Sequence, residues 1–445
     1  MNKKEREVYQ YIIPPLTSKF ILMESMDGNY DQYTPPEPTL ALIQLIESFE
    51  LPNEIKIDET ENISMESFAK SYANISKYPK KTYIEKLGTL QNLAHIAHDI
   101  GKKKVMDTLL PMLSYVAKEQ FYDLKLEMLK HLPEIIDMLN DQGEGYAKIR
   151  DLIWPCVKAL QNEEESVSEQ ANLIILKLAG TFTEDDVGIY ILSHVLSLIH
   201  DTENVECKIK ALSLLNILSP KLGKNYCQQY VVHEIASFAS ETDQQLRKSV
   251  CHNFIKIAET VGSEIFSNKL FPVYKSLAED SIWSVKKAAV DVIVEVSKLC
   301  LPILQQSLTK IIETLLHDSN KWIKQACHER LGPFMISLPK HIISNELIDN
   351  FIQLSERKKS TDEELYFCAY YMPGVLLTIG EKIWPQLQTA YKALLAIKLP
   401  NIRETLASSI HEFFKILPAP SHQLLFETFD QFILTKGIMT TQILL

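Results

Sequence analysis

The chain has 445 residues, a formal net charge of −11, a hydrophobic content of 46% and only 13 glycines. This composition is typical of an ordered, helix-rich protein, and it argues against disorder and against a nucleic-acid surface because the basic runs are short and isolated. No run of about 18 apolar residues occurs, so the sequence predicts neither a membrane span nor a signal peptide.

The first segment, residues 1–66, has a composition different from the rest. Residues 24–38 contain turn-forming residues and several prolines, and they precede the helix-like stretch 39–49. Residues 51–66 are acidic and have no apolar period. We therefore expect an N-terminal helical and loop segment with a proline-rich linker over 1–66.

From residue 67 to residue 417 the chain repeats a small and apolar pattern about every 40 residues. Nine anchor positions share this pattern: Ile84, Leu124, Val167, Cys207, Leu246, Val285, Ile323, Leu365 and Ile402. Such a period indicates two-helix repeats of the HEAT or armadillo kind, each of which buries its apolar faces only against its neighbours. The predicted fold is an all-α, right-handed α-solenoid of about nine to ten helix pairs.

Within each repeat, the first helix and the following turn carry recurring residues. In several repeats the first helix contains a proline, so we expect a bend there. These prolines are Pro111, Pro155, Pro272 and Pro385. The polar turns contain Asp280 and Asp318, each placed to cap the second helix or nearby backbone amides.

The candidate partner-binding residues lie in or just after the turns. Trp283 and Trp322 occupy neighbouring turns, where each ring either closes the end of the core or stands exposed as an anchor for a partner protein. Basic residues stand at matching positions: Arg247, Lys248, Lys286, Lys287 and Lys324. They either assist such an anchor or pair with aspartates of the neighbouring repeat in a ladder.

No constellation of catalytic residues is present. His95 and His98 share a helix face without the further ligands of a zinc site, and no phosphate-binding loop or nucleophile elbow occurs. Three late glycines are interpreted as helix ends or bends: Gly332, Gly374 and Gly380. The seven scattered cysteines are typical of reduced thiols in a cytosolic or nuclear protein. We expect a non-catalytic chain without cofactor or metal.

Four runs carry a resemblance to a known family: SIWSVKKAAVDVIVEVS, KWIKQACHERLGPFMISL, YFCAYYMPGVLLTIGEKIW and NIRETLASSIHEFF. They resemble the HEAT-repeat regulatory subunit 1 family of protein phosphatase 4, which is related to the scaffold subunit of protein phosphatase 2A. The segments 331–334 and 372–375 are the more particular part of the match. The resemblance implies a non-catalytic subunit whose inter-helix turns grip a serine/threonine phosphatase catalytic subunit, with substrates or further regulatory proteins as other partners.

An alternative from another class is a nuclear-transport or other adaptor solenoid that binds peptide cargo. Either interpretation predicts a cytoplasmic or nuclear protein without nucleic-acid or membrane partners. Residues 418–445 read as an incomplete last repeat, so a truncated chain or a surface covered by a partner is expected there.

Overall fold

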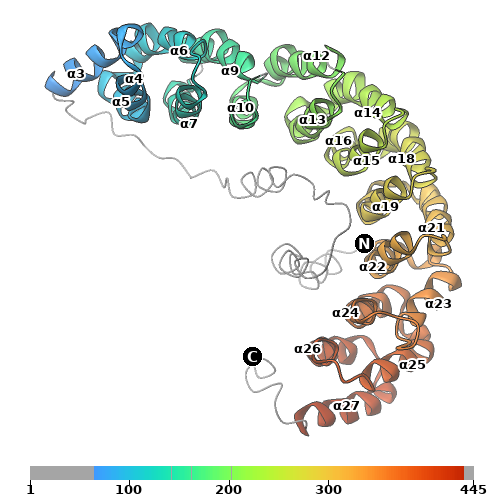
Figure 1. The fold of residues 1–445 in the computed structure, drawn as a ribbon. Helices are drawn as coiled ribbons and strands as arrows, with labels where there is room; N and C mark the ends of the chain where they lie inside the picture. The colour runs from blue at the N-terminus through green and yellow to red at the C-terminus, as the bar shows by residue number, and fades with distance from the viewer. Residues whose placement is uncertain (1–64, 142, 162, 202, 435–445) are drawn as a thin grey trace. The chain divides into compact units, whose positions relative to one another are not determined.

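The computed structural model describes residues 65–434 apart from 142, 162 and 202, and these residues are built of helices without a strand (Figure 1). The predicted all-α stack of helix pairs is confirmed over this range. None of its helices is both long and apolar enough to cross a membrane. The predictions for residues 1–64 and 435–445 concern positions outside the described residues.

The chain divides into two compact units, residues 1–194 and 195–445, a division that the sequence period did not indicate. The described part of unit 1 contains these helices in order: α3 (Met65–Ser76), η2 (Tyr78–Lys80), α4 (Tyr83–Gln91), α5 (Leu93–Lys104), η3 (Val105–Leu109), α6 (Leu110–Val116), α7 (Tyr122–Leu139), α8 (Glu144–Lys148), η4 (Ile149–Ile153), α9 (Trp154–Leu160), α10 (Glu165–Thr181), α11 (Glu184–Asp186) and η5 (Val187–Leu192).

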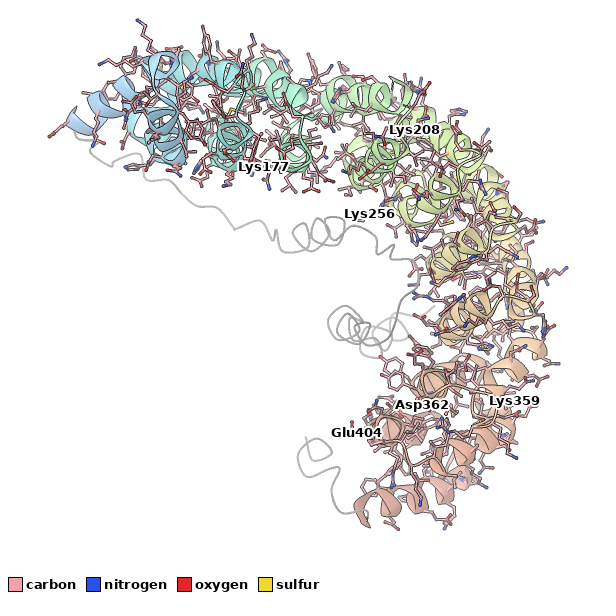
Figure 2. The ribbon with its side chains drawn as sticks, viewed as in Figure 1. Lys177, Lys208, Lys256, Lys359, Asp362 and Glu404 are labelled. Atoms are coloured by element: carbon pink, nitrogen blue, oxygen red, sulfur yellow. The ribbon has the colours of Figure 1, made fainter. Side chains whose placement is uncertain are left out.

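In unit 1 the second helices of successive repeats pack on one another. The kinked pair α4 and α5 contacts α7, and α7 contacts α10. Lys177 of α10, marked in Figure 2, reaches the Asp137 carboxylate of α7 at 2.6 Å. The first helices form the other layer, in which α6 contacts η4.

Unit 2 continues the same alternation. Its helices are α12 (Ser193–Asp201, which begins at the end of unit 1), α13 (Val205–Tyr226), η6 (Cys227–Val231), α14 (Val232–Ala239), α15 (Gln244–Asn253), α16 (Ile255–Val261), α17 (Ser263–Ile265), η7 (Phe266–Leu270), α18 (Phe271–Ala278), α19 (Trp283–Asp291), α20 (Ile293–Leu299), α21 (Pro302–Leu316), α22 (Lys321–Ser337), η8 (Lys340–Ile342), α23 (Asn345–Gln353), α24 (Asp362–Ile379), η9 (Glu381–Ile383), α25 (Trp384–Leu395), α26 (Pro400–Ile416), η10 (Ala419–Ser421) and α27 (His422–Leu434).

Two layers are visible within unit 2 (Figure 1). The second-helix layer runs through α13, α15, α19, α22, α24 and α26, and each of these helices contacts the next. The first-helix layer contains α14, α18, α21, α23, α25 and α27. The sequence predicted a surface loop before α24, and the structure has one there (Figure 2). The loop carries Lys359, and α24 begins after it at Asp362.

Every predicted anchor falls in a different second helix, which confirms the repeat, but two anchors have the wrong register. Ile84 is 79% exposed, because α4 begins at Tyr83 and its first buried residues are Thr89 and Leu90. Cys207 is also exposed, because it lies in the first turn of α13. The remaining seven anchors are buried.

Irregular turns stand where the sequence predicts bends in the first helices. A π-helical turn precedes the segments that contain Pro111, Pro155 and Pro272, and a 3₁₀ turn precedes Pro385. Each proline therefore stands in the first turn of its helix, where the missing N–H costs no hydrogen bond. The sequence interpretation did not foresee a second set of prolines inside second helices, namely Pro133, Pro220, Pro333 and Pro373.

Glycine serves two purposes near the end of unit 2. Gly380 has a φ of 91° and ends α24, as predicted. Gly332 and Gly374 instead lie inside α22 and α24, so of the two predicted roles, a helix end or a bend, the structure excludes the helix end for them. A Cβ at Gly332 would lie 2.5 Å from the Cβ of Tyr371, which shows that glycine lets the two helices approach closely.

Candidate functional site

The two turn tryptophans are half exposed. Trp283 is the first residue of α19 and Trp322 the second of α22, with exposed fractions of 45% and 47%. The ammonium group of Lys321 lies 4.7 Å from the centre of the Trp322 ring. Because α19 packs on α22, the two rings belong to neighbouring turns of one edge. Their exposure favours the interpretation as anchors over the alternative in which they close the core.

Arg247 links two neighbouring turns in unit 2. Its Nε and Nη2 atoms donate to the Asp280 carboxylate at 2.7 and 3.2 Å, and its Nη1 donates to two turn carbonyls, those of Glu241 and Thr242. Asp280 also accepts a hydrogen bond from the Ile282 amide at 2.8 Å. Burial raises the pKa of the Asp280 carboxyl, but these hydrogen bonds outweigh it and hold the pKa below its usual value.

Lys286 forms the same kind of link between the next two turns of unit 2. Its ammonium group donates to Asp318 at 2.6 Å, and Asp318 accepts the Asn320 amide at 2.8 Å. The hydrogen bond from Lys286 holds the pKa of the Asp318 carboxyl below its usual value. The predicted ladder of basic residues and loop aspartates is therefore present. Arg247 and Lys286 have mostly buried side chains that join neighbouring repeats, so they are not free to contact a partner.

The ladder also occurs in unit 1, where sequence reasoning missed it. Lys86 pairs with Glu119 at 2.5 Å, and Lys125 pairs with Glu163 at 2.8 Å. The available signal was a lysine directly after the Leu124 anchor, with an acidic residue in the following turn. A search restricted to aspartate could not find it because both acceptors here are glutamates.

Three of the predicted basic residues remain accessible. Lys287 pairs with Asp291 of its own helix at 3.0 Å, and its side chain is 40% exposed. Lys248 and Lys324 are half-buried and form no ion pair within the part of the chain that the structure describes. We call Trp283 and Trp322, together with these three lysines, the tryptophan edge.

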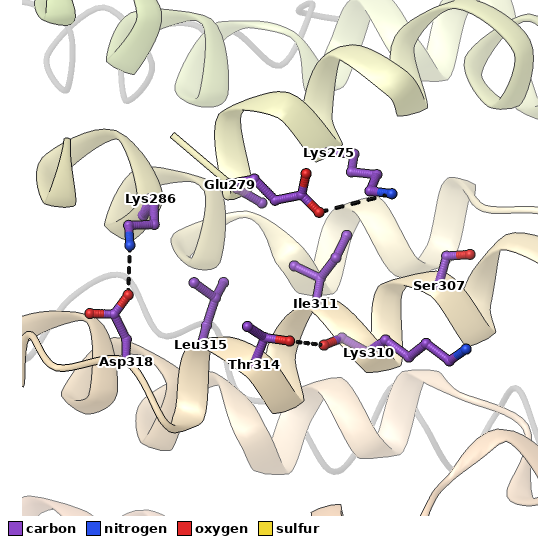
Figure 3. A pocket seen from close by; sticks show the side chains of 10 residues that line it. Lys275, Glu279, Lys286, Ser307, Lys310, Ile311, Thr314, Leu315 and Asp318 are labelled. Carbon is purple, nitrogen blue, oxygen red and sulfur yellow. Dashed lines mark hydrogen bonds and ion pairs between the residues drawn. The ribbon is translucent and has the colours of Figure 1, made fainter. Parts of the chain in front are cut away.

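A cavity of about 520 Å³ lies between α18 and α21, beside the ladder (Figure 3). Lys286 and Asp318 form one end, and Lys275 and Glu279 approach to 3.9 Å on the other side. Lys310 of α21 lines the remaining wall. The cavity contains charges of both signs, and among the described residues no three His, Cys, Asp or Glu side chains form a metal-binding group.

The buried thiols are not suited to nucleophilic chemistry. Six of the seven cysteines, all within the described residues, are buried. Burial raises the pKa of Cys156 and of Cys300 to about 12, so both thiols are protonated at neutral pH. Cys251 is buried as well, and burial raises the pKa of its thiol.

The stacked helix pairs and their ladder define an α-solenoid of HEAT-like repeats. A chain of the solved structure of Kap95p with RanGDP superposes with a TM-score of 0.65, at 10% identity, over 82% of this chain and 50% of that chain. Importin beta gives a TM-score of 0.58 at 10% identity, over 80% and 49%. At such identity the likeness concerns the fold alone. No protein-family model matches the sequence.

Among curated proteins, the chain is similar to regulatory subunits of serine/threonine-protein phosphatase 4. Regulatory subunit 1 of Mus musculus is 22% identical over 261 residues, and that of Homo sapiens is 23% identical over 260; each match covers 57% of this chain and 27% of the relative. Regulatory subunit 4 of Mus musculus is 19% identical over 293 residues, 59% of this chain and 33% of the relative.

The resemblance inferred from the sequence is thus confirmed, and it extends from regulatory subunit 1 to regulatory subunit 4. The matches span about a third of the relatives' length or less. Both relatives are named as regulatory subunits, which agrees with the expectation of a non-catalytic chain.

Proposed function

We propose that this chain is a non-catalytic regulatory or scaffold subunit of a serine/threonine phosphatase of the protein phosphatase 4 type. The observation that carries the proposal is the consistent similarity to two regulatory subunits of that phosphatase. The fold supports it, since stacked turns offer a row of loops to a partner. On this proposal the chain works in the cytoplasm or nucleus, and its remaining surface recruits substrates.

We place the contact with the catalytic subunit on the tryptophan edge. Trp283 and Trp322 are exposed in neighbouring turns. Tryptophan is one of the residues enriched among those that carry most of the binding energy near the centre of protein interfaces. The ladder supports this placement because Lys286 and Asp318 hold the two turns together before any partner binds. Such preorganisation reduces the ordering entropy that association would otherwise cost.

The test is co-purification of the phosphatase 4 catalytic subunit with the full chain, followed by titration of the purified pair. Trp283→Ala combined with Trp322→Ala is expected to weaken binding about 30-fold or more, since a hot-spot residue contributes about 2 kcal/mol or more. The matched control is Ile303→Ala, an 80% exposed residue of α21 outside this edge. Circular dichroism must show the same helicity in all three proteins.

The two levels of the proposal fail separately. Binding that survives the double tryptophan variant would reject the tryptophan edge and leave the regulatory role standing. Absence of the catalytic subunit from the purified wild-type chain would reject the regulatory role itself. An adaptor that carries peptide cargo, which the fold also allows, would instead bind a small GTPase or basic targeting peptides without a stable phosphatase partner.

A further inference from the structure

Large apolar side chains gather on two neighbouring turns of unit 1. One turn joins α3 to α4 and the other joins α6 to α7. Five exposed residues share these turns, with exposed fractions from 37% to 79%: Tyr83, Ile84, Tyr115, Phe121 and Tyr122. We call them the aromatic edge. Single exposed apolar residues need no explanation, but several that gather on neighbouring turns point to an interaction surface.

Three contacts join the two turns into one surface. The rings of Tyr83 and Phe121 meet edge to face with their centres 4.9 Å apart. The Tyr83 hydroxyl donates to the Asp123 carboxylate at 3.2 Å. Beneath them, Lys86 and Glu119 form a rung of the ladder. The aromatic edge is therefore held in place by the repeat stacking and needs little ordering when a partner binds.

The carboxylates around the aromatic edge are occupied within the chain. Glu85 accepts hydrogen bonds from the Thr82 amide and hydroxyl in the capping box of α4. Glu119 accepts from Lys86, and Asp123 accepts from Tyr83, as described above. Glu119 is paired with an ammonium group, whereas Glu85 and Asp123 accept from neutral donors and keep their negative charge.

Three exposed lysines lie near the same two turns. Lys77 and Lys80 precede α4, and Lys118 lies between α6 and α7. None of their ammonium groups forms a hydrogen bond or ion pair with the residues that the structure describes. With Lys81 and Lys86, the two turns carry five lysines against three carboxylates, those of Glu85, Glu119 and Asp123, so the rim of the apolar surface has an excess of positive charge. This rim contrasts with the overall net charge of −11.

We propose that the aromatic edge binds a peptide segment of another protein in which bulky apolar side chains are flanked by aspartate or glutamate. Burial of aromatic and aliphatic surface supplies the affinity, and tyrosine contributes contact area at low entropic cost. The lysine rim attracts the acidic flanks and fixes the orientation of the peptide. This surface lies in unit 1 and is independent of the tryptophan edge, so the inference does not rest on the proposed phosphatase role.

The test selects short random peptides displayed on phage against the immobilised full chain. Enriched sequences are expected to combine Phe, Trp or Leu with Asp or Glu. The tightest synthetic peptide is then titrated against variants by fluorescence polarisation. Ile84→Ser with Phe121→Ser removes apolar area, and serine suits position 121 because Phe121 is the N-cap of α7 and makes no capping bond there. We expect at least tenfold weaker binding.

A second variant tests the charge of the rim without touching the apolar residues. Lys80→Glu with Lys118→Glu is expected to weaken binding severalfold and to reduce its dependence on salt concentration. The matched control, Ile303→Ser in unit 2, should bind within twofold of the wild type. Thermal unfolding of each variant establishes that the fold is intact.

Four results would overturn the proposal. The first is a library without enrichment, and the second is an enriched set that is basic or lacks bulky apolar residues. The third is unchanged affinity in both double variants. The fourth is a different occupant: a single-stranded oligonucleotide that displaces the peptide, or a dimer in light scattering that the Ile84→Ser, Phe121→Ser variant dissociates.

Discussion

The ladder connection between Arg247 and Asp280 makes the sharpest prediction about how the repeats are held together. Arg247→Ala removes two hydrogen bonds to the carboxylate and two to turn carbonyls. The side chains of the pair are 14% and 9% exposed. Exposed ion pairs contribute about 0–1 kcal/mol, whereas breaking a buried pair costs about 3–5 kcal/mol. For this largely covered pair beside a turn we expect a loss of about 2 kcal/mol.

Hydrogen exchange measured by mass spectrometry on α15 and α19 is the suitable assay, because it reports local opening of the two helices that the pair connects. A loss of about 2 kcal/mol corresponds to roughly 30-fold faster exchange there. Lys275→Ala is the matched control, since its ammonium group is 3.9 Å from Glu279 and both side chains are more than half exposed. We expect about 0.5 kcal/mol or less for it.

A double-mutant cycle then separates the pair from other effects. Asp280→Ala should be about as damaging as Arg247→Ala, because each leaves a partner without its counter-charge. The combined variant should be less damaging than the two losses added, by about 1–2 kcal/mol. Additive losses, or an Arg247→Ala effect no larger than that of Lys275→Ala, would show that the ladder does not stabilise the stack.

Three further predictions follow from the same structure. Gly332→Ala should lower stability by about 1–3 kcal/mol in thermal unfolding, because the added Cβ would collide with Tyr371. Gly88→Ala should be neutral or stabilising, because nothing lies within 4 Å of its Cβ. Equal effects of the two substitutions would contradict the close helix approach. The stability difference between wild type and Asp318→Asn should be fully present above about pH 5 and should diminish as the pH falls through the lowered pKa of the folded carboxyl, because only the ionised form is stabilised by Lys286. A difference that does not change with pH would refute this. Under native conditions a thiol reagent should label the exposed Cys207 rapidly and the six buried cysteines only after denaturation. Fast labelling of several cysteines in peptide mapping would contradict the burial described.

Several features of this protein were determined by the sequence alone, because they depend on short-range patterns. The period near 40 residues placed each anchor in its own second helix, and the turn composition placed Trp283 and Trp322 at the beginning of neighbouring helices. Helix periodicity and turn chemistry are local, so these inferences needed no knowledge of packing. The resemblance to phosphatase 4 regulatory subunits also came from the residues themselves, and the comparisons confirm it.

Only the tertiary structure decided which side chains are covered, because coverage depends on the neighbouring repeat. Among residues with the same sequence signature, Lys286 is a ladder residue while Lys324 has no ion-pair partner in the described chain. At the start of the next second helix, Asp362 pairs with Arg357 and Glu364 with His328 instead. Ile84 matched the anchor pattern and yet faces solvent. Gly332 was interpreted as a helix end or bend, and only the packing shows that it lets α22 approach the next helix closely. A repeat specifies its own helices, while its surface is specified jointly with the repeats on either side.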